Sequence, residues 1–281
     1  MKSTLILTCE ADLRSALPNQ VPIAKGETSL FDKISSYIIS AESWIFSTFI
    51  PVPVAMPLIT NPDDTFIDDL RPIAACEALR RALPTLDLVL TPNGFATLGT
   101  QNLAVASKSR VDRLVAQLIA ERDEAIIRLI PLLIYHVEGW RDTLQGKFFL
   151  STLAPTPQFA EMCGITENKW EWWLAHRAAI IDIEEMLAET YFSPELIARM
   201  RRHEDDGFKG LPELEHVRDG IHAQIALYLQ EKPINHRRMK DLVNYIREHP
   251  AAFPEWHNSL TARLYFPEVF VNKKKASGYW F

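Results

Sequence analysis

Apolar residues recur every three or four positions along most of this 281-residue chain, and this spacing places them on one face of an α-helix. The pattern predicts a helix over residues 28–49, where the hydroxyl of Thr28 or Ser29 can cap the free amides of the first turn. A second helix is predicted to begin at Asp68 and Asp69, and the longest helix covers residues 109–144. The apolar face of the first of these helices consists of Phe31, Ile34, Ile38, Ala41, Ile45 and Phe49.

The second half of the chain is predicted to be almost wholly helical. Ser193-Pro194 is typical of a helix start, because serine caps free amides and proline, which has no amide hydrogen, fits the first helical position. The predicted fold class is therefore mainly α, a multi-helix bundle. The helices predicted here cover residues 167–192, 194–202, 212–231, 235–248 and 255–265.

Three segments depart from the helical pattern. Residues 1–27 are predicted to be an N-terminal extended arm, because the run from Ser3 to Thr8 is apolar and partly β-branched and is followed by prolines. The prolines after residue 50 predict a long surface connection over residues 51–64. Two short apolar runs flank Asn93-Gly94, a pair that favours the positive φ angles of a tight turn, so a small β-hairpin is predicted over residues 87–98.

The order of these elements predicts two helical units, at residues 28–146 and 147–265, followed by a C-terminal tail at residues 266–281. Each half has a helix with an acidic Ala/Glu patch, a second helix, a turn, and a helix that begins with basic residues. Amphipathic helices resemble one another by construction, so a duplication and a coincidence both stay open. In this comparison Arg110, Leu114, Val115 and Leu118 align with Arg238, Leu242, Val243 and Ile246.

The composition of the chain argues against several classes of function. A formal net charge of −6 argues against a broad nucleic-acid-binding face, which is usually basic. The three cysteines, Cys9, Cys76 and Cys163, are far apart and form no zinc spacing, so a reducing compartment is expected. The apolar run at the start is too short for a signal peptide, and no stretch approaches the roughly 18 apolar residues of a membrane span, so no membrane partner is expected.

The motifs do not predict an enzyme. Nucleotide-binding, serine hydrolase and zinc protease motifs are absent from the sequence, and no catalytic, cofactor-binding or metal-binding residue is assigned. Glu213-x-x-His216 has the spacing of a diiron ligand pair, but such sites need two copies and the sequence has one. Cys163 and His176 could form a nucleophile pair only if the fold brought them together, and a buried structural thiol is the preferred interpretation.

Two aromatic groups are candidates for contacts with a partner, and for the three tryptophans a role as large core anchors, with one ring lying on the surface, stays equally open. Trp170, Trp172 and Trp173 cannot all face one core at helical spacing, and tryptophan is enriched at the energetic centres of interfaces. The tail is basic and then aromatic, and exposed aromatic residues at a chain end favour docking into a groove of the same chain or onto another subunit. Its candidate interface residues are Lys273, Lys274, Lys275, Tyr279, Trp280 and Phe281.

Four stretches of the chain carry a resemblance to a known group of proteins. They are LFDKISSYIISAESWI, LVLTPNGFATLGTQNLAVASKSRVDRLVAQL, the half that begins QFAEMCGI, and the ending FVNKKKASGYWF. Together they resemble a family of unannotated proteins from phages and prophages of Bacteroidetes. The order of helices within each half also resembles the small head-tail connector proteins of tailed phages.

This resemblance implies a virion structural protein, a ring subunit that joins portal to tail. It implies copies of itself, portal and tail proteins, and DNA passing through a channel as partners, with residence in the host cytoplasm during assembly and then in the virion. The chain departs from the connectors in having about twice their length and a hairpin near Asn93-Gly94. Ring stoichiometry and position in the particle are therefore left open.

Two other functions stay open from the sequence. One is a helical metal-dependent enzyme with iron, manganese or zinc near Glu213 and His216. The other is a DNA-packaging partner that binds nucleic acid locally through Lys273–Lys275 or through Arg199, Arg201 and Arg202.

Overall fold

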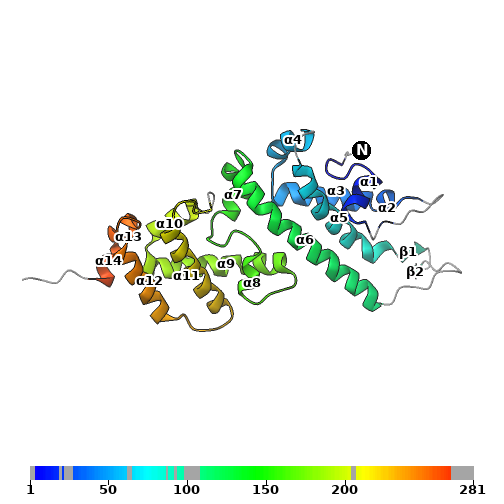
Figure 1. The fold of residues 1–281 in the computed structure, drawn as a ribbon. Coiled ribbons are helices and arrows are strands. Elements are labelled where there is room, and N and C mark those ends of the chain that lie inside the picture. Colours follow the sequence, from blue (N-terminus) through cyan, green and yellow to red (C-terminus); the bar gives the residue numbers. More distant parts are fainter. Residues whose placement is uncertain are drawn as a thin grey trace, which may run out of the picture. The chain divides into compact units, whose positions relative to one another are not determined.

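The computed structural model describes residues 4–18, 21, 28–61, 65–86, 88–91, 94–97, 108–203 and 207–266. Helices dominate these residues (Figure 1), which confirms the prediction of a mainly α fold. The chain forms two compact units, Met1–Ile180 and Ile181–Phe281.

The first unit is built on one long helix, α5, which packs against α3 and α6 and also contacts α1 and α4. Alanines on its buried faces let these neighbours approach closely, and α6 covers it along much of its length (Figure 1). The helices of this unit are α1 (Glu10–Ala16), α2 (Leu30–Lys33), α3 (Ser35–Thr48), α4 (Val52–Thr60), α5 (Phe66–Leu86), α6 (Lys108–His136), η1 (Trp140–Asp142), α7 (Leu144–Phe149), α8 (Phe159–Met162) and the first part of α9 (Lys169–Leu187).

The boundary between the units falls inside α9, whereas the sequence predicted it near residues 147–165. The reason is that α7 and the beginning of α9 share a core with the preceding helices. Trp173 stacks on Phe149 with ring centroids 5.6 Å apart, and the backbone amide of Trp170 donates to Asp123 on α6. Residues 147–180 therefore belong to the first unit.

The second unit begins with the end of α9 and a π-helical turn, and its core is closed by a buried tryptophan. The indole nitrogen of Trp256 donates to the carbonyl of Tyr191 at 2.8 Å, so its one polar group is satisfied. The predicted start at Ser193-Pro194 is confirmed, since the Ser193 hydroxyl accepts from the amide of Leu196 at the start of α10. The remaining elements are η2 (Ala188–Phe192), α10 (Pro194–His203), α11 (Pro212–Leu229), α12 (His236–Glu248), α13 (Pro254–His257) and α14 (Leu260–Tyr265).

The helix predicted over residues 28–49 is present as α2 and α3, with a break at Ile34. Ser29 is its N-cap, and its hydroxyl accepts from the amide of Asp32 at 3.1 Å. Five of the six predicted apolar positions are buried, and only Phe31 keeps partial exposure. The three-four spacing therefore located this core face correctly.

The prediction of an extended N-terminal arm over residues 1–27 is wrong for much of the described part. Residues 10–16 form α1, which packs on α5, and Ile6, Leu7 and Leu13 are fully buried. The segment before α1 is held by a buried carboxylate, Glu42 on α3. Its oxygens accept from the backbone amides of Leu5, Ile6 and Leu7 at 2.8, 2.9 and 3.0 Å.

The connection predicted over residues 51–64 contains a helix, α4, despite its prolines. Pro53 lies in the first turn, where no amide needs an intrahelical partner, so only Pro57 removes a hydrogen bond from the interior. Two short strands, β1 (Leu88–Thr91) and β2 (Gly94–Thr97), pair antiparallel with Leu88 opposite Thr97. They lie within the range predicted for the hairpin, while its turn residues Pro92 and Asn93 lie outside the described residues.

Among the described residues, no single helix is long and apolar enough to cross a membrane. The pair α3 and α4 passes that test by length and composition when taken together, but it is bent by 114°. The apolar face of α3 is buried in the unit, where the helix packs against α5.

Replacing Glu42 by alanine is expected to lower the free energy of unfolding by about 2–4 kcal/mol, because three backbone amides lose their acceptor in a buried place. Urea denaturation followed by circular dichroism measures the change. Ser43→Ala, on the exposed side of the same helix, is the control and should change stability by less than about 0.5 kcal/mol. Equal stability of the Glu42→Ala variant and the wild type would show that the carboxylate does not anchor the N-terminal segment.

Candidate functional site

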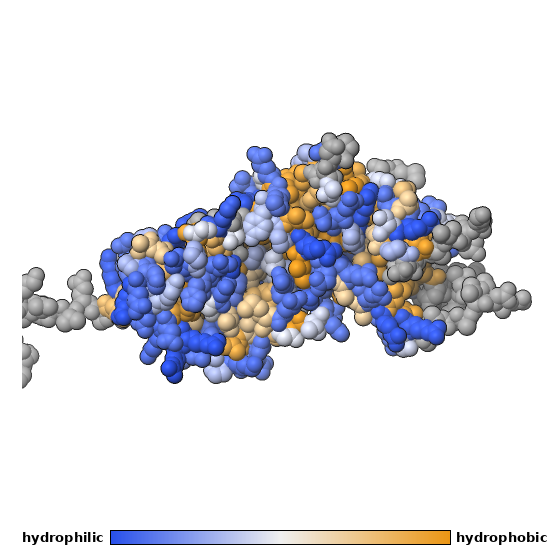
Figure 2. Space-filling view, in the orientation of Figure 1, coloured by the Kyte–Doolittle hydropathy of each residue, from blue (hydrophilic) through white to orange (hydrophobic). Residues whose placement is uncertain are grey.

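The first unit exposes an apolar helix. Eight of the nine residues of α4, VPVAMPLIT, are apolar, yet only Ala55 is buried. Helices that are apolar on all sides are normally enclosed on all sides. Apolar residues interrupt the polar surface in this part of the first unit (Figure 2). Much of α4 therefore has an apolar surface that the described part of the chain leaves uncovered.

A groove of about 420 Å³ lies in the same unit, where the end of α3 meets α7 and α9. Leu144 on α7 is 84 % exposed and Leu174 on α9 is 46 % exposed, which are high values for leucines. The groove is lined by Trp44, Ser47, Thr48, Leu144, Gln145, Phe148, Trp170 and Leu174. We call this groove together with α4 the apolar surface of the first unit.

The wall of the groove is stiffened by the aromatic cluster behind it. The ring of Trp170 lies 5.0 Å from that of Phe49 and 5.6 Å from that of Trp173. The indole nitrogens of Trp140 and Trp173 donate to the carbonyls of Phe49 and Ala154. Since these rings are packed and the indole nitrogens of Trp140 and Trp173 are paired, they hold the wall in one arrangement.

The three tryptophans predicted as interface residues have different environments. Trp173 is fully buried and Trp170 nearly so, which places both in the core of the first unit; Trp170 touches the groove only as part of its wall. Trp172 is half-buried and stacks on His176 with centroids 4.3 Å apart. The prediction that at least one of the three points away from the core is therefore confirmed for Trp172. The tail residues Lys273–Lys275 and Tyr279–Phe281 lie outside the described residues.

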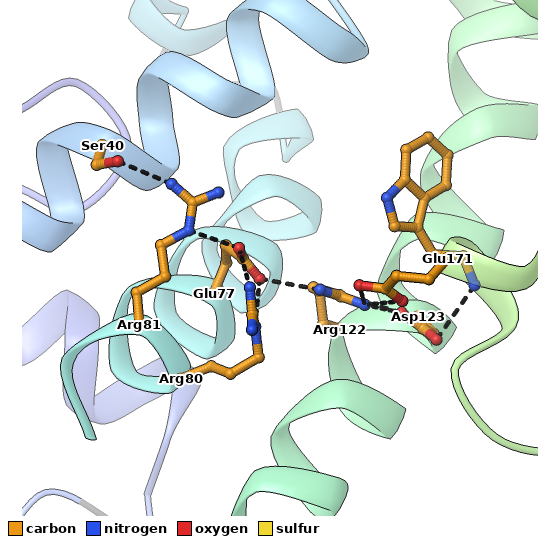
Figure 3. A network of polar contacts seen from close by, with 8 residues as sticks. Ser40, Glu77, Arg80, Arg81, Arg122, Asp123 and Glu171 are labelled. Atoms are coloured by element: carbon orange, nitrogen blue, oxygen red, sulfur yellow. Dashed lines mark hydrogen bonds and ion pairs between the residues drawn. The ribbon is translucent and has the colours of Figure 1, made fainter. Parts of the chain in front are cut away.

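A network of buried charges holds α5, α6 and α9 together (Figure 3). At its centre the guanidinium of Arg122, 1 % exposed, donates to Glu77 at 2.9 Å and to Asp123 and Glu171 at 2.7 Å. Glu77 also accepts from Arg80 and Arg81. Three guanidinium groups and three carboxylates thus balance in charge, which permits the burial of Arg122, Glu77 and Asp123 at the centre. Arg80, Arg81 and Glu171 lie at the edge of the network and stay partly exposed.

The ionisation of the network follows from burial and pairing. Burial would raise the pKa of Glu77, but hydrogen bonds from Arg80 and Arg122 and their charges lower it to about 2. Burial would lower the pKa of Arg122, but the Asp123 and Glu171 carboxylates raise it above its ordinary value. Burial raises the pKa of Asp123 in spite of the adjacent Arg122. The side chains of the network are therefore mainly ionised and ion-paired, which suits a structural connection between helices.

The two buried cysteines, Cys76 and Cys163, are poor nucleophiles. Burial, reinforced by the neighbouring Glu121, raises the pKa of Cys76 to about 12, and burial raises that of Cys163 to about 11. His176 uses Nδ1 to contact the carbonyl of Trp172. These surroundings fit the preferred interpretation of Cys163 as a buried structural thiol.

The described residues contain no group of three or more His, Cys, Asp or Glu side chains that could hold a metal ion. His216 packs against the ring of Tyr245, with centroids 4.7 Å apart. Of the basic residues considered for nucleic acid, Arg199 donates to Glu255 and to the carbonyl of Ala252, and Arg201 donates to Glu184. These two arginines are therefore engaged within the second unit.

The apolar surface of the first unit was not predicted from the amino-acid sequence. A signal was present, because VPVAMPLI is an apolar run between two helices, but its prolines led to the prediction of a connection. The groove had no local signal, since it joins residues 44–48 of α3 to residues 144–148 of α7 and residues 170–174 of α9, which are distant in the chain.

The chain matches a protein-family profile described as a family of unknown function (DUF6712) over residues 27–149 and 223–264. The protein belongs to this family. The first matched segment covers most of the described helices of the first unit, and the second covers α12–α14 and the end of α11. No curated protein and no solved structure matches the chain.

The Glu77→Gln variant is expected to be about 3 kcal/mol less stable than the wild type at neutral pH, because it leaves part of the buried positive charge unpaired. The folded pKa of about 2 lies below the ordinary 4.5, so ionised Glu77 stabilises the fold above pH 4.5 and this contribution is lost as the pH falls toward 2. The stability difference should therefore shrink with acidification.

Urea denaturation of both proteins between pH 3 and 7 tests this. Glu121→Gln, at an exposed position of α6, is the control and should show a small difference at every pH. A difference for Glu77→Gln that does not change with pH would contradict the low pKa.

Proposed function

We propose that this protein is a non-enzymatic assembly subunit that forms a homo-oligomer through the apolar surface of its first unit. The observation that supports this most directly is the exposure of Leu144 and Leu174 beside a preformed groove. Exposed contiguous apolar area on a folded protein is typical of interaction sites. The rigid aromatic wall reduces the conformational entropy that a partner would have to overcome on binding.

A homo-oligomer is favoured because the groove and α4 differ in shape. A hollow and a partly exposed apolar helix on the same unit can serve as the two unlike faces of a heterologous contact. Repeated by rotation, such a contact closes into a ring. The aromatic tail adds a second segment with the composition of an interface.

The biological setting is proposed from the sequence resemblance. We propose a ring of the head-tail connector type that joins portal to tail, with assembly in the host cytoplasm and residence in the virion. Portal and tail proteins are its further partners, and DNA would pass through the ring. The charge of −6 is compatible with this setting, since an acidic wall does not retain DNA.

The proposal of two connector-like units is a finer form of the same hypothesis. Its support is the alignment of α6 with α12, both of which carry a buried apolar stripe. Leu118 and Ile246, which occupy equivalent places in that alignment, are both fully buried. The units of the structure are unequal in length, so a duplication would require additions in the first unit.

Substituting Leu144 by glutamate is expected to weaken self-association at least tenfold, because a charge then enters the apolar surface. Light scattering coupled to size-exclusion chromatography measures the mass across a concentration series. Leu264→Glu is the matched control, since Leu264 is 73 % exposed but lies in the second unit outside the groove. A wild-type protein that stays monomeric at high micromolar concentration, or equal behaviour of both variants, would refute the proposal.

Deletion of residues 270–281 is expected to reduce assembly, because it removes the aromatic residues Tyr279, Trp280 and Phe281 together with the adjacent lysines. The same light-scattering series and averaged electron micrographs of the particles give the mass and symmetry. A deletion variant that still forms wild-type particles would exclude the tail from the interface and leave the groove as the site of contact.

A further inference from the structure

A cavity in the second unit has a different character from the apolar surface of the first. It has a volume of about 270 Å³ and lies where α11 faces α12. Its lining combines apolar groups with groups that bind charges. The lining residues are His216, Gly220, Ala223, Gln224, Arg238, Asp241, Leu242 and Tyr245.

Gln224 is the informative residue of this cavity. The side chain is 1 % exposed, and its carbonyl oxygen accepts from the backbone amide of Asn235 at 2.8 Å. This hydrogen bond fixes which end of the amide is which, because a backbone N–H needs an oxygen acceptor. The side-chain nitrogen Nε2 is buried and has no hydrogen-bond partner among the described residues.

A buried amide nitrogen without an acceptor is unfavourable to folding, and native proteins rarely keep one without a use. Gln224 lines the cavity, so a ligand acceptor that displaces the groups covering Nε2 would complete its hydrogen bonding. The carboxylate or carbonyl oxygen of a ligand is such an acceptor.

The rim of the cavity carries one charge of each sign. Arg238 and Asp241 lie three positions apart on α12, a spacing that permits an ion pair, yet their side chains form none with each other or with another described residue. An unused guanidinium can bind a carboxylate, and an unused carboxylate can bind an ammonium group. The Arg238 guanidinium and the Asp241 carboxylate are therefore available to a ligand that carries both a carboxylate and an ammonium group.

Apolar side chains form the remaining walls of the cavity and can contact the apolar part of a ligand. The ring of Tyr245 contacts those of His216 and His249, with centroids 4.7 and 4.2 Å away. Gly220 lets Leu242 approach α11, since a Cβ at this position would lie 2.5 Å from a Leu242 methyl group. The volume is below the 300–1,000 Å³ usual for sites of drug-sized ligands, so the ligand is smaller.

We infer that this cavity binds a small zwitterion with an apolar body, of the size and chemistry of a free α-amino acid. Its carboxylate accepts from Gln224 Nε2 and pairs with Arg238, its ammonium group pairs with Asp241, and its side chain lies against Tyr245 and Leu242. The inference does not depend on the proposed assembly function, because it concerns the second unit alone.

The test uses L-leucine as the probe, with the full-length protein. Two analogues separate its charges, 4-methylpentanoate without the ammonium group and 3-methylbutylamine without the carboxylate. Titration is followed by calorimetry and by the ¹H–¹⁵N signals of the Gln224 side-chain amide. Leucine is expected to shift these signals and to bind at least tenfold more tightly than either analogue.

Two variants locate the site. Gln224→Glu keeps an oxygen for the Asn235 amide but replaces the donor with an acceptor, and should weaken leucine binding at least tenfold. Arg238→Gln, at an exposed position, should do the same without affecting folding. Gln230→Glu makes the same chemical change outside the cavity and is the control, since its new carboxylate can still accept from Lys232.

Each other outcome counts against the inference. Signals of Gln224 that leucine leaves unchanged at tens of millimolar would show that water alone occupies the cavity. Leucine binding of equal strength in the Gln224→Glu and Arg238→Gln variants would place it elsewhere. Stronger binding of 4-methylpentanoate than of leucine would remove Asp241 from the site and reduce the ligand class to simple carboxylates.

Discussion

The first unit depends on the pairing of one buried cation. Arg122 lies on α6 with almost no access to water, and an unpaired guanidinium there would be too costly to keep folded. Its partners come from three helices, with Glu77 on α5, Asp123 beside it and Glu171 on α9. The ion pairs can form only when these helices have the correct relative rotation. The network therefore selects one packing among many that apolar contacts alone would allow.

That selection has consequences for the proposed function. Pairing Arg122 with Glu171 places the start of α9 against α6, and the same turn of α9 inserts Trp170 and Trp173 into the aromatic cluster. The same placement leaves Leu174 facing outward beside Leu144. One helix thus supplies a core contact and an exposed apolar wall. The groove therefore results from the ion pairs of Arg122 and from the packing of the buried aromatic rings.

The two candidate sites differ in how they are built. The apolar surface of the first unit offers area and few polar groups, which suits association with a protein. The cavity of the second unit offers a small volume and an unused donor, which suits a small ligand. A protein of a family of unknown function can therefore combine assembly with ligand binding in separate parts of the chain.

Most of the helices and many of their ends could be predicted from the amino-acid sequence, although α1 and α4 could not. Three-four spacing identified the buried face from Ile34 to Phe49, and the capping residues Ser29 and Ser193 were located correctly, because these signals act between residues a few positions apart. Which carboxylates meet Arg122 depends on long-range packing, since its partners Glu77 and Glu171 lie 45 and 49 positions away. The tertiary structure also decided that Trp170 and Trp173 are core residues, that Glu42 holds the N-terminal segment, and that the units divide inside α9. Side-chain type and local spacing specify the elements, whereas long-range partners are specified by the arrangement that buries the aromatic cluster and pairs the charges around Arg122.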